Sequence, residues 1–129
     1  MTAATQRFKL GIVRDVLNAA GEPFFGTQPL EILKANPLID WEYTPERVKE
    51  IPADWAARYD ALYVNSSRVS AATVAREDRR LQIIARHGVG YDSVDVAALT
   101  EKCIVLTNTP LAIRRPVAVA TLTLLFALA

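Results

Sequence analysis

Short apolar runs recur along the chain, each of a length suited to one β-strand and each separated from the next by polar residues. The runs span residues 8–13, 38–43, 61–64, 81–85 and 103–106. The last three begin at residues 61, 81 and 103, steps of 20 and 22 residues, which leave room for a strand, two turns and a helix. Several runs are continuously apolar, as parallel strands are when helices cover both faces of a sheet. The pattern predicts an α/β fold with a doubly wound parallel sheet of about five strands.

Capping signals predict helices between these strands. A hydroxyl or carboxylate side chain just before a helix satisfies free backbone N–H groups, and proline fits the first turn. Residues 18–27 contain two glycines and a proline and predict a loop. Pro116 fits the first turn of a last, strongly apolar helix. The other predicted helices begin at Thr44-Pro45-Glu46, at Ser70 (residues 71–80) and at Asp92 with Asp95 (residues 94–101).

The composition narrows the class of protein. The chain has 129 residues, with 15 Lys and Arg against 14 Asp and Glu, a formal charge of +1, and 51% hydrophobic residues. One globular domain is therefore expected. A near-neutral chain without a run of Lys or Arg lacks the clustered positive charge that nucleic acids and anionic membranes require, so neither partner is expected.

Features that report on location predict the cytoplasm. Cys103 is the single cysteine and cannot form an internal disulfide, and residues 1–9 lack the apolar core of a signal peptide. The most apolar stretch, residues 117–129, is thirteen residues long, whereas a membrane-spanning helix needs about 20. No membrane span is expected, and the apolar last segment predicts burial between domains or subunits.

Ligands of open α/β sheets bind beyond the carboxyl ends of the strands, so the segments that follow the strands are the places to look for chemistry. Residues 14–15, 65–68, 86–91 and 107–110 should face this one edge. Gly88 and Gly90 allow a sharp turn whose N–H groups, at Val89 and Gly90, could bind a carboxylate. A tight turn without a ligand is the alternative. Ser93 occupies the third position of G-x-G-x-x-G, so this is not a dinucleotide fingerprint.

Other candidate side chains predict structure rather than catalysis. His87 is the only histidine, and the sequence places no carboxylate beside it, so it is interpreted as a solvated or hydrogen-bonded turn residue. Cys103 opens an apolar run and is expected to be a buried, inert thiol. One histidine and one cysteine supply no metal-ligand set. No catalytic residue and no metal site are assigned.

Three segments carry a family resemblance. Residues 81–95, 103–110 and 116–118 closely resemble the D-isomer-specific 2-hydroxyacid dehydrogenases, and the earlier chain fits that family's flavodoxin-like N-terminal substrate domain in its rhythm of elements. The resemblance implies that residues 1–115 form this domain. It also implies that residues 116–129 begin the connecting helix to a missing NAD-binding Rossmann domain, with the apolar interdomain helix cut short at Ala129.

The resemblance also implies site residues. The backbone amides of Val89 and Gly90, with Gly88, are expected to hold the substrate carboxylate, and Val117 is expected near the nicotinamide. The family's Arg, Glu and His follow the Rossmann segment and have no counterpart here, so His87 does not take their role. Many relatives place an Asn at the position of Ile113 and an acid at the position of Val119, and the side chains found here cannot make the corresponding polar contacts.

The implied function is that of the N-terminal portion of an oxidoreductase. The complete enzyme would use NAD or NADP to transfer a hydride to or from a small D-2-hydroxy or 2-oxo acid, and is expected to be a homodimer. The 129-residue chain alone is expected to be inactive and to bind no cofactor. The alternative is a non-catalytic, flavodoxin-like module that binds small acids. Asn65 at the expected phosphoacceptor position disfavours a receiver, and residues 14–17 lack a flavodoxin phosphate loop.

Overall fold

A five-stranded parallel sheet forms the centre of the molecule. The computed structural model describes residues 7–129. The strands lie in the order β2-β1-β3-β4-β5, and each neighbouring pair is parallel. This order is that of the flavodoxin-like doubly wound fold, so the predicted fold class is confirmed. The strands are β1 (Phe8–Ile12), β2 (Ile39–Tyr43), β3 (Ala61–Val64), β4 (Ile83–Arg86) and β5 (Val105–Thr107).

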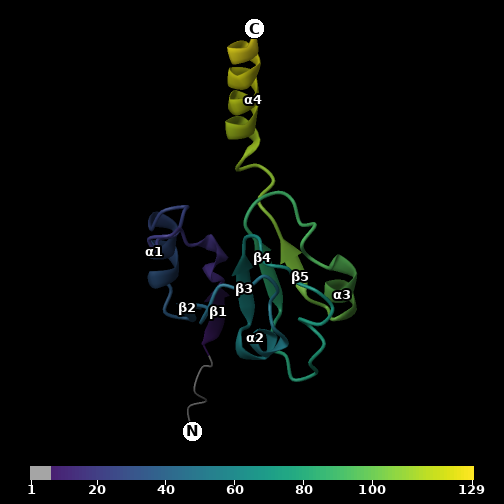
Figure 1. The fold of residues 1–129 in the computed structure, drawn as a ribbon. Helices are drawn as coiled ribbons and strands as arrows, with labels where there is room; N and C mark the ends of the chain where they lie inside the picture. Colours follow the sequence, from purple (N-terminus) through teal and green to yellow (C-terminus); the bar gives the residue numbers. More distant parts are fainter. Residues whose placement is uncertain (1–6) are drawn as a thin grey trace.

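Helices cover both faces of the sheet. The helices packed around the sheet are the 3-10 turn η1 (Arg14–Val16), α1 (Gln28–Lys34), α2 (Ala53–Arg58) and α3 (Val96–Glu101), and α4 (Arg114–Leu128) follows them at the end of the chain. Figure 1 shows α1 and α3 on opposite sides of the sheet. Leu30 of α1 packs in one apolar cluster with Ile12, whereas α2 and α3 contribute to a second cluster around β3 and β4.

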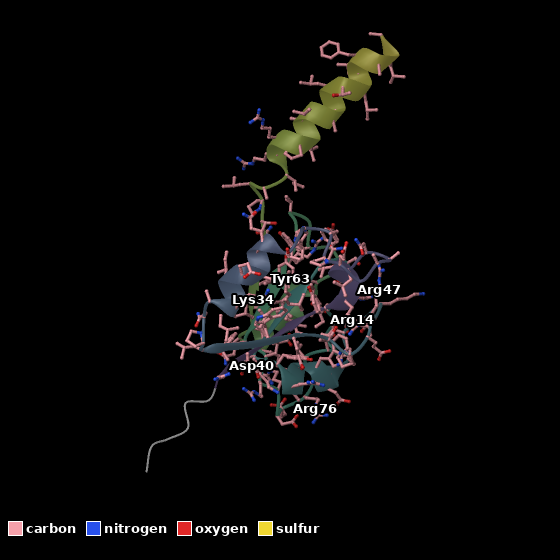
Figure 2. All side chains as sticks on the ribbon, turned by 90° about the vertical axis from the view of Figure 1, so that its left-hand side faces the viewer. Arg14, Lys34, Asp40, Arg47, Tyr63 and Arg76 are labelled. Carbon is pink, nitrogen blue, oxygen red and sulfur yellow. The ribbon has the colours of Figure 1, made fainter. Side chains whose placement is uncertain are left out.

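The two clusters lie on opposite faces of the sheet, because successive side chains along a strand point to opposite faces. Leu62 and Ile84 are fully buried in the larger cluster, beneath α2 and α3. Tyr63, the residue after Leu62 on β3, belongs to the other cluster, where it packs with Ile12 and Phe25. Figure 2 shows Tyr63 close to α1, on the side of the molecule that also carries Lys34. The apolar strands therefore contribute side chains to both clusters.

The helix predicted to begin at Thr44 is wrong. Thr44 is buried, its hydroxyl donates to the Glu46 carbonyl at 3.1 Å, and the Arg14 side chain donates from Nε to the Thr44 carbonyl at 2.7 Å. These contacts fix residues 44–47 as a turn against the loop after β1. The helix begins only at Ala53, after Pro52. Thr44 was predicted to cap a helix, but it forms hydrogen bonds with Arg14 and Glu46 instead.

The helix predicted over residues 71–80 is also wrong, because only a short turn forms there. The Thr73 hydroxyl accepts from the Ser70 N–H at 3.1 Å and donates to the Ile51 carbonyl at 2.8 Å. The preceding backbone is extended and bridges Glu50 with Arg68 and Val69 with Val94. These tertiary hydrogen bonds replace the helical ones.

Other local predictions are confirmed. Asp95 caps α3 by accepting from the Ala98 N–H at 3.0 Å, although the helix starts two residues later than expected, at Val96. Pro116 lies in the first turn of α4. Residues 18–27 form the predicted loop. No helix was predicted at the position of α1, where Thr27 precedes the helix without a capping hydrogen bond from its side chain.

The last helix, α4, extends away from the rest of the molecule (Figure 1). None of its residues is buried, and Phe126 and Leu128 are 74% and 88% exposed. An exposed helix made largely of apolar residues presents a surface that other protein normally covers. Among the described residues, no helix is long and apolar enough to cross a membrane.

Candidate functional site

The carboxyl ends of the strands bring the four expected segments to one edge. The turn after β4 begins with the His87 N–H donating to the Val64 carbonyl of β3 at 2.8 Å. The loop after β5 contacts this turn through Asn108 and Thr109. The segment after β1 contacts the segment after β3 through Asp15. The predicted clustering of these loops is therefore confirmed.

Asp15 holds the loop that follows β3. Its carboxylate is 4% exposed and accepts hydrogen bonds from three consecutive backbone N–H groups. The distances are 3.1 Å from Asn65 and 2.7 Å from both Ser66 and Ser67. A buried carboxylate needs such donors. Asp15 thus has its acceptor capacity used by the fold and fixes one wall of the edge.

Hydrogen bonds to Asn108 and Thr109 fix the paired-glycine turn, residues 88–90. Gly88 has φ +111°, a backbone conformation that residues other than glycine rarely adopt. Its N–H donates to the Thr109 hydroxyl and its carbonyl accepts from the Thr109 N–H, both at 2.9 Å. The Val89 carbonyl accepts from the Asn108 side-chain amide at 2.9 Å. The loop after β5 therefore sets the orientation of this turn.

Unlike the N–H of Gly88, the N–H groups of Val89 and Gly90 have no hydrogen-bond acceptor in the described structure. Both residues are exposed to solvent. Two consecutive amides without protein acceptors, in a turn held from the other side, are the usual elements of an anion-binding turn. The turn can therefore accept a carboxylate without losing an existing hydrogen bond.

Two charged side chains flank this turn. The Asp92 carboxylate lies close to Gly90, 3.6 Å from the position that a Cβ on this glycine would take. Arg86 lies on the other side, with Nη1 2.9 Å from the position of a Cβ on Gly88. The Nε and Nη1 atoms of Arg86 are buried and have no hydrogen-bond partner among residues 7–129. This feature could not be predicted from the sequence, because burial of the guanidinium depends on the strand register.

His87 is engaged in a cluster of aromatic side chains. Its Nδ1 is hydrogen-bonded to the Tyr63 hydroxyl, and its ring stacks on Phe25 with 5.8 Å between centroids. Burial lowers the pKa of His87 below its usual 6.5, and the charge of Arg86 lowers it further. The interpretation of His87 as a hydrogen-bonded turn residue is confirmed.

The prediction for Cys103 is wrong. The residue is exposed rather than buried, and it has φ +54° in the turn that ends α3. Ile104, the next residue, enters the core in its place. The described part of the chain also contains no group of three His, Cys, Asp or Glu residues that could hold a metal ion.

Comparison with known proteins decides the family. The family model of the D-isomer specific 2-hydroxyacid dehydrogenase catalytic domain matches residues 16–123, which include the turn and the loop after β5 that contacts it. The chain belongs to this 2-hydroxyacid dehydrogenase family. Residues 16–123 cover most of the described sheet, so the match concerns the domain as a whole and not only the glycine turn.

Individual relatives agree with this assignment. The chain is 37% identical over 65 residues to D-3-phosphoglycerate dehydrogenase of Archaeoglobus fulgidus, covering 50% of this chain and 11% of the relative. It is 34% identical over 70 residues to glyoxylate reductase of Thermococcus onnurineus, covering 54% and 21%. The matched segments thus span only a minor part of these 2-hydroxyacid dehydrogenase family members.

A solved structure shares the fold. It is described as a putative D-isomer specific 2-hydroxyacid dehydrogenase, NAD-binding, from Polaromonas sp.. The TM-score is 0.56 at 20% sequence identity, and the match covers 80% of this chain and 30% of the other. The family's domain therefore has the strand arrangement found here.

The family assignment leaves individual contacts of α4 open. Val117 is 54% exposed and, like Ile113 and Val119, offers an apolar side chain. Ile113 and Val119 are exposed as well. The expected proximity of Val117 to a nicotinamide therefore stays a prediction.

Proposed function

We propose that this chain is the N-terminal portion of an NAD(P)-dependent enzyme that transfers a hydride between the nicotinamide and C2 of a small D-2-hydroxy or 2-oxo acid. Residues 1–115 are the substrate domain. Residues 116–129 begin the helix that connects it to a Rossmann domain. The family assignment supports the reaction class, and the glyoxylate reductase relative acts, by its name, on a small acid of this kind.

The observation that supports the proposal for this chain is that the backbone N–H groups of Val89 and Gly90 have no hydrogen-bond acceptor among the described residues. Each can donate to one oxygen of a substrate carboxylate, and the bonds from Thr109 and Asn108 hold the turn in place while they do so. Fixing the carboxylate orients C2 of the acid, which reduces the entropy cost of reaching the reactive geometry. The role of this domain is positioning.

The residues present do not form a site for the dinucleotide. The sequence has no G-x-G-x-x-G, and its paired-glycine turn carries Ser93 at the third position. The hydride carrier, NAD or NADP, would be held by the further domain that the family provides. We therefore assign no residue of this chain except Val117 to the nicotinamide side, and no proton-transfer step to His87.

The exposed apolar helix supports this division of the chain. All of α4 is exposed, and burying its large apolar side chains against a further domain or a second subunit would be strongly favourable, at about 25 cal/mol per Å². We expect the complete enzyme to be a homodimer that covers this helix. The 129-residue chain alone is expected to be inactive.

Calorimetric titration tests the acid site directly. Glyoxylate, pyruvate and hydroxypyruvate should each bind the 129-residue chain weakly but saturably. Gly90→Pro, which removes the N–H, should weaken binding more than Gly90→Ala, which keeps it. Equal affinities for the two variants, or no binding to the unaltered chain, would contradict the acid site.

A second titration tests the division between domains. NADH fluorescence should show no saturable binding to this chain. Saturable binding would overturn the assignment of the cofactor to a further domain. Acid binding by a protein that proves to have no further domain would favour the non-catalytic module instead.

A further inference from the structure

Arg86 combines two properties that are rarely found together in a folded chain. Its guanidinium is buried at Nε and Nη1, and neither atom has a hydrogen-bond partner in the described residues. Burying polar N–H groups without acceptors is costly, so these two nitrogens next to the turn need an explanation. Other arginines of the chain, such as Arg76, are paired with carboxylates at the surface.

The turn is built to let this guanidinium approach. A Cβ on Gly88 would lie 2.9 Å from Nη1, 3.6 Å from Cζ and 3.8 Å from Nη2 of Arg86. The absence of a side chain at residue 88 therefore permits the guanidinium to lie along the backbone, in addition to permitting φ +111°. One glycine serves both the bend and the contact with Arg86.

The charge of Arg86 lies beside the turn that carries the open amides. It lies against Gly88, and the next two residues carry the N–H groups that have no acceptor in the described structure. Its field also reaches the neighbouring side chains: it adds to the burial that lowers the pKa of His87, and it opposes the burial that raises the pKa of Tyr63. On the other side of the turn, Asp92 would repel an anion. A positive charge is what this turn needs to favour a carboxylate.

We propose that Arg86 is a positioning residue of the acid site, which supplies the positive charge for the carboxylate bound by the amides of Val89 and Gly90. This inference rests on the proposed function, because it concerns the same site. The guanidinium and the two amides together form one anion site. The bound carboxylate supplies the negative partner that the guanidinium of Arg86 lacks in the described residues.

Nuclear magnetic resonance of the 129-residue chain with sodium pyruvate as the probe tests this inference. The backbone N–H signals of Val89 and Gly90 should shift, and the Nε–H signal of Arg86 should shift with the same apparent Kd. Arg86→Gln should raise the Kd about ten- to a hundredfold, the range for loss of a charged partner. Arg86→Lys should recover part of the affinity, and Arg47→Gln, in an exposed loop, should leave the Kd unchanged.

The outcomes separate the two proposals. No shift at Val89 or Gly90 in the unaltered chain would overturn the acid site and, with it, the role of Arg86. Shifts of these amides with an unmoved Arg86 Nε–H signal would overturn only the role of Arg86. The same holds for an unchanged Kd in Arg86→Gln. The Nε–H measurement uses the unaltered chain, so it decides the matter even if the variants do not fold.

Discussion

The two ends of the parallel sheet handle charge in different ways. At the amino ends, the Asp60 carboxylate accepts two hydrogen bonds from Arg80, at 3.1 and 2.7 Å, and one from the Lys9 N–H at 2.7 Å. At the carboxyl ends, Asp15 is bound by backbone N–H groups alone, and Arg86 has two buried nitrogens without a partner in the described chain. The buried carboxylate at the amino ends is paired with a cation on folding, whereas the described residues at the carboxyl ends leave two nitrogens of Arg86 and the N–H groups of Val89 and Gly90 without partners.

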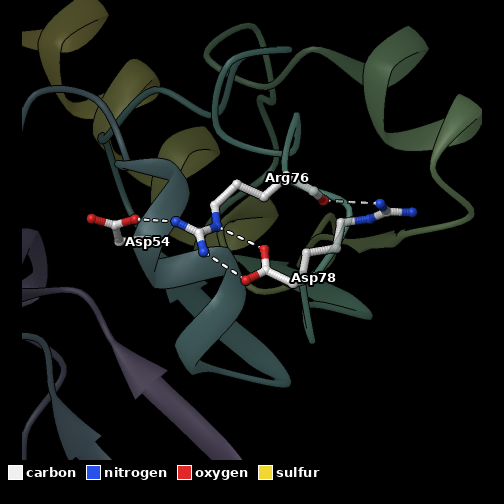
Figure 3. Close-up of polar contacts among 4 residues, drawn as sticks. Asp54, Arg76 and Asp78 are labelled. Carbon is white, nitrogen blue, oxygen red and sulfur yellow. Dashed lines mark hydrogen bonds and ion pairs between the residues drawn. The ribbon is translucent and has the colours of Figure 1, made fainter.

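The surface near the amino ends extends the first pattern. Arg76 contacts Asp54 at 2.7 Å and Asp78 at 2.6 Å, and its carbonyl accepts from Arg79 (Figure 3). Lys102 pairs with Glu77 at 3.0 Å. Folding provides each of these charges with a partner of opposite sign. The comparison teaches that the location of unsatisfied charge, more than its amount, indicates the edge that binds a ligand.

Removing the Asp15 side chain should produce the largest loss of stability. Asp15→Ala leaves the N–H groups of residues 65–67 without their acceptor, and that of the buried Ser67 cannot turn to water. We expect the free energy of unfolding to fall by about 3 kcal/mol. Urea denaturation followed by circular dichroism measures this value.

Asp15→Asn is the matched control, because it preserves shape and one acceptor oxygen. Its loss should be about half as large. If the two variants are equally stable, the three amide bonds at the carboxyl edge do not stabilise the loop as we argue, and the contrast between the two ends of the sheet is weakened.

Asp60→Ala should have a smaller effect, about 2 kcal/mol. Asp60 is as well buried as Asp15, but the Arg80 side chain is 32% exposed and its guanidinium can turn toward water after its partner is removed. The same urea denaturation gives the comparison. A loss larger than that of Asp15→Ala would reverse the order that the two ends predict.

The strands could be predicted well from the sequence, because a buried strand consists mostly of apolar residues. Each strand lies within about two residues of its apolar run, since a strand covered on both faces must be apolar throughout. Helices were predicted less well. Thr44 and Ser70 have side chains that cap helices in general, but here they bond to Arg14, Glu46 and Glu50 across the fold. Local signals cannot say which partner a polar side chain will find.

The candidate site shows the same division. The paired glycines indicated free amides by geometry alone, because a residue with positive φ and a sharp turn expose N–H groups. The role of Arg86 could not be inferred, since it depends on the pairing of Arg86 with Val64 and on the close contact with Gly88. Cys103 is exposed and has a positive φ in the turn after α3, and neither property could be inferred from the apolar run that follows it.

A weaker effect is expected from titration at the carboxyl end. The folded chain holds the pKa of His87 below 6.5 through burial and the charge of Arg86, whereas the unfolded chain binds a proton at the ordinary pKa. The unfolded state therefore takes up more protons as the pH falls below about 6.5, and stability decreases. His87→Gln should flatten this dependence between about pH 5 and 7.

Urea midpoints of the two proteins at several pH values measure this difference. Arg86→Lys serves as the control, because it keeps a positive charge beside His87 and should keep the slope. Parallel curves for the unaltered chain and His87→Gln would show that the histidine is not held in its neutral form by the fold.

The smallest effect should come from Arg76→Ala at the opposite end of the sheet. Arg76 forms ion pairs with two exposed carboxylates (Figure 3), and its pKa is raised chiefly by the hydrogen bonds to Asp78. Water and salt replace such exposed pairs at little cost, so the thermal midpoint should change less than in Asp60→Ala. Thermal denaturation at low and high salt measures this, and the small difference should shrink further at high salt. A loss as large as that of Asp15→Ala would mean that the surface pairs, and not the buried carboxylates, stabilise the ends of the sheet.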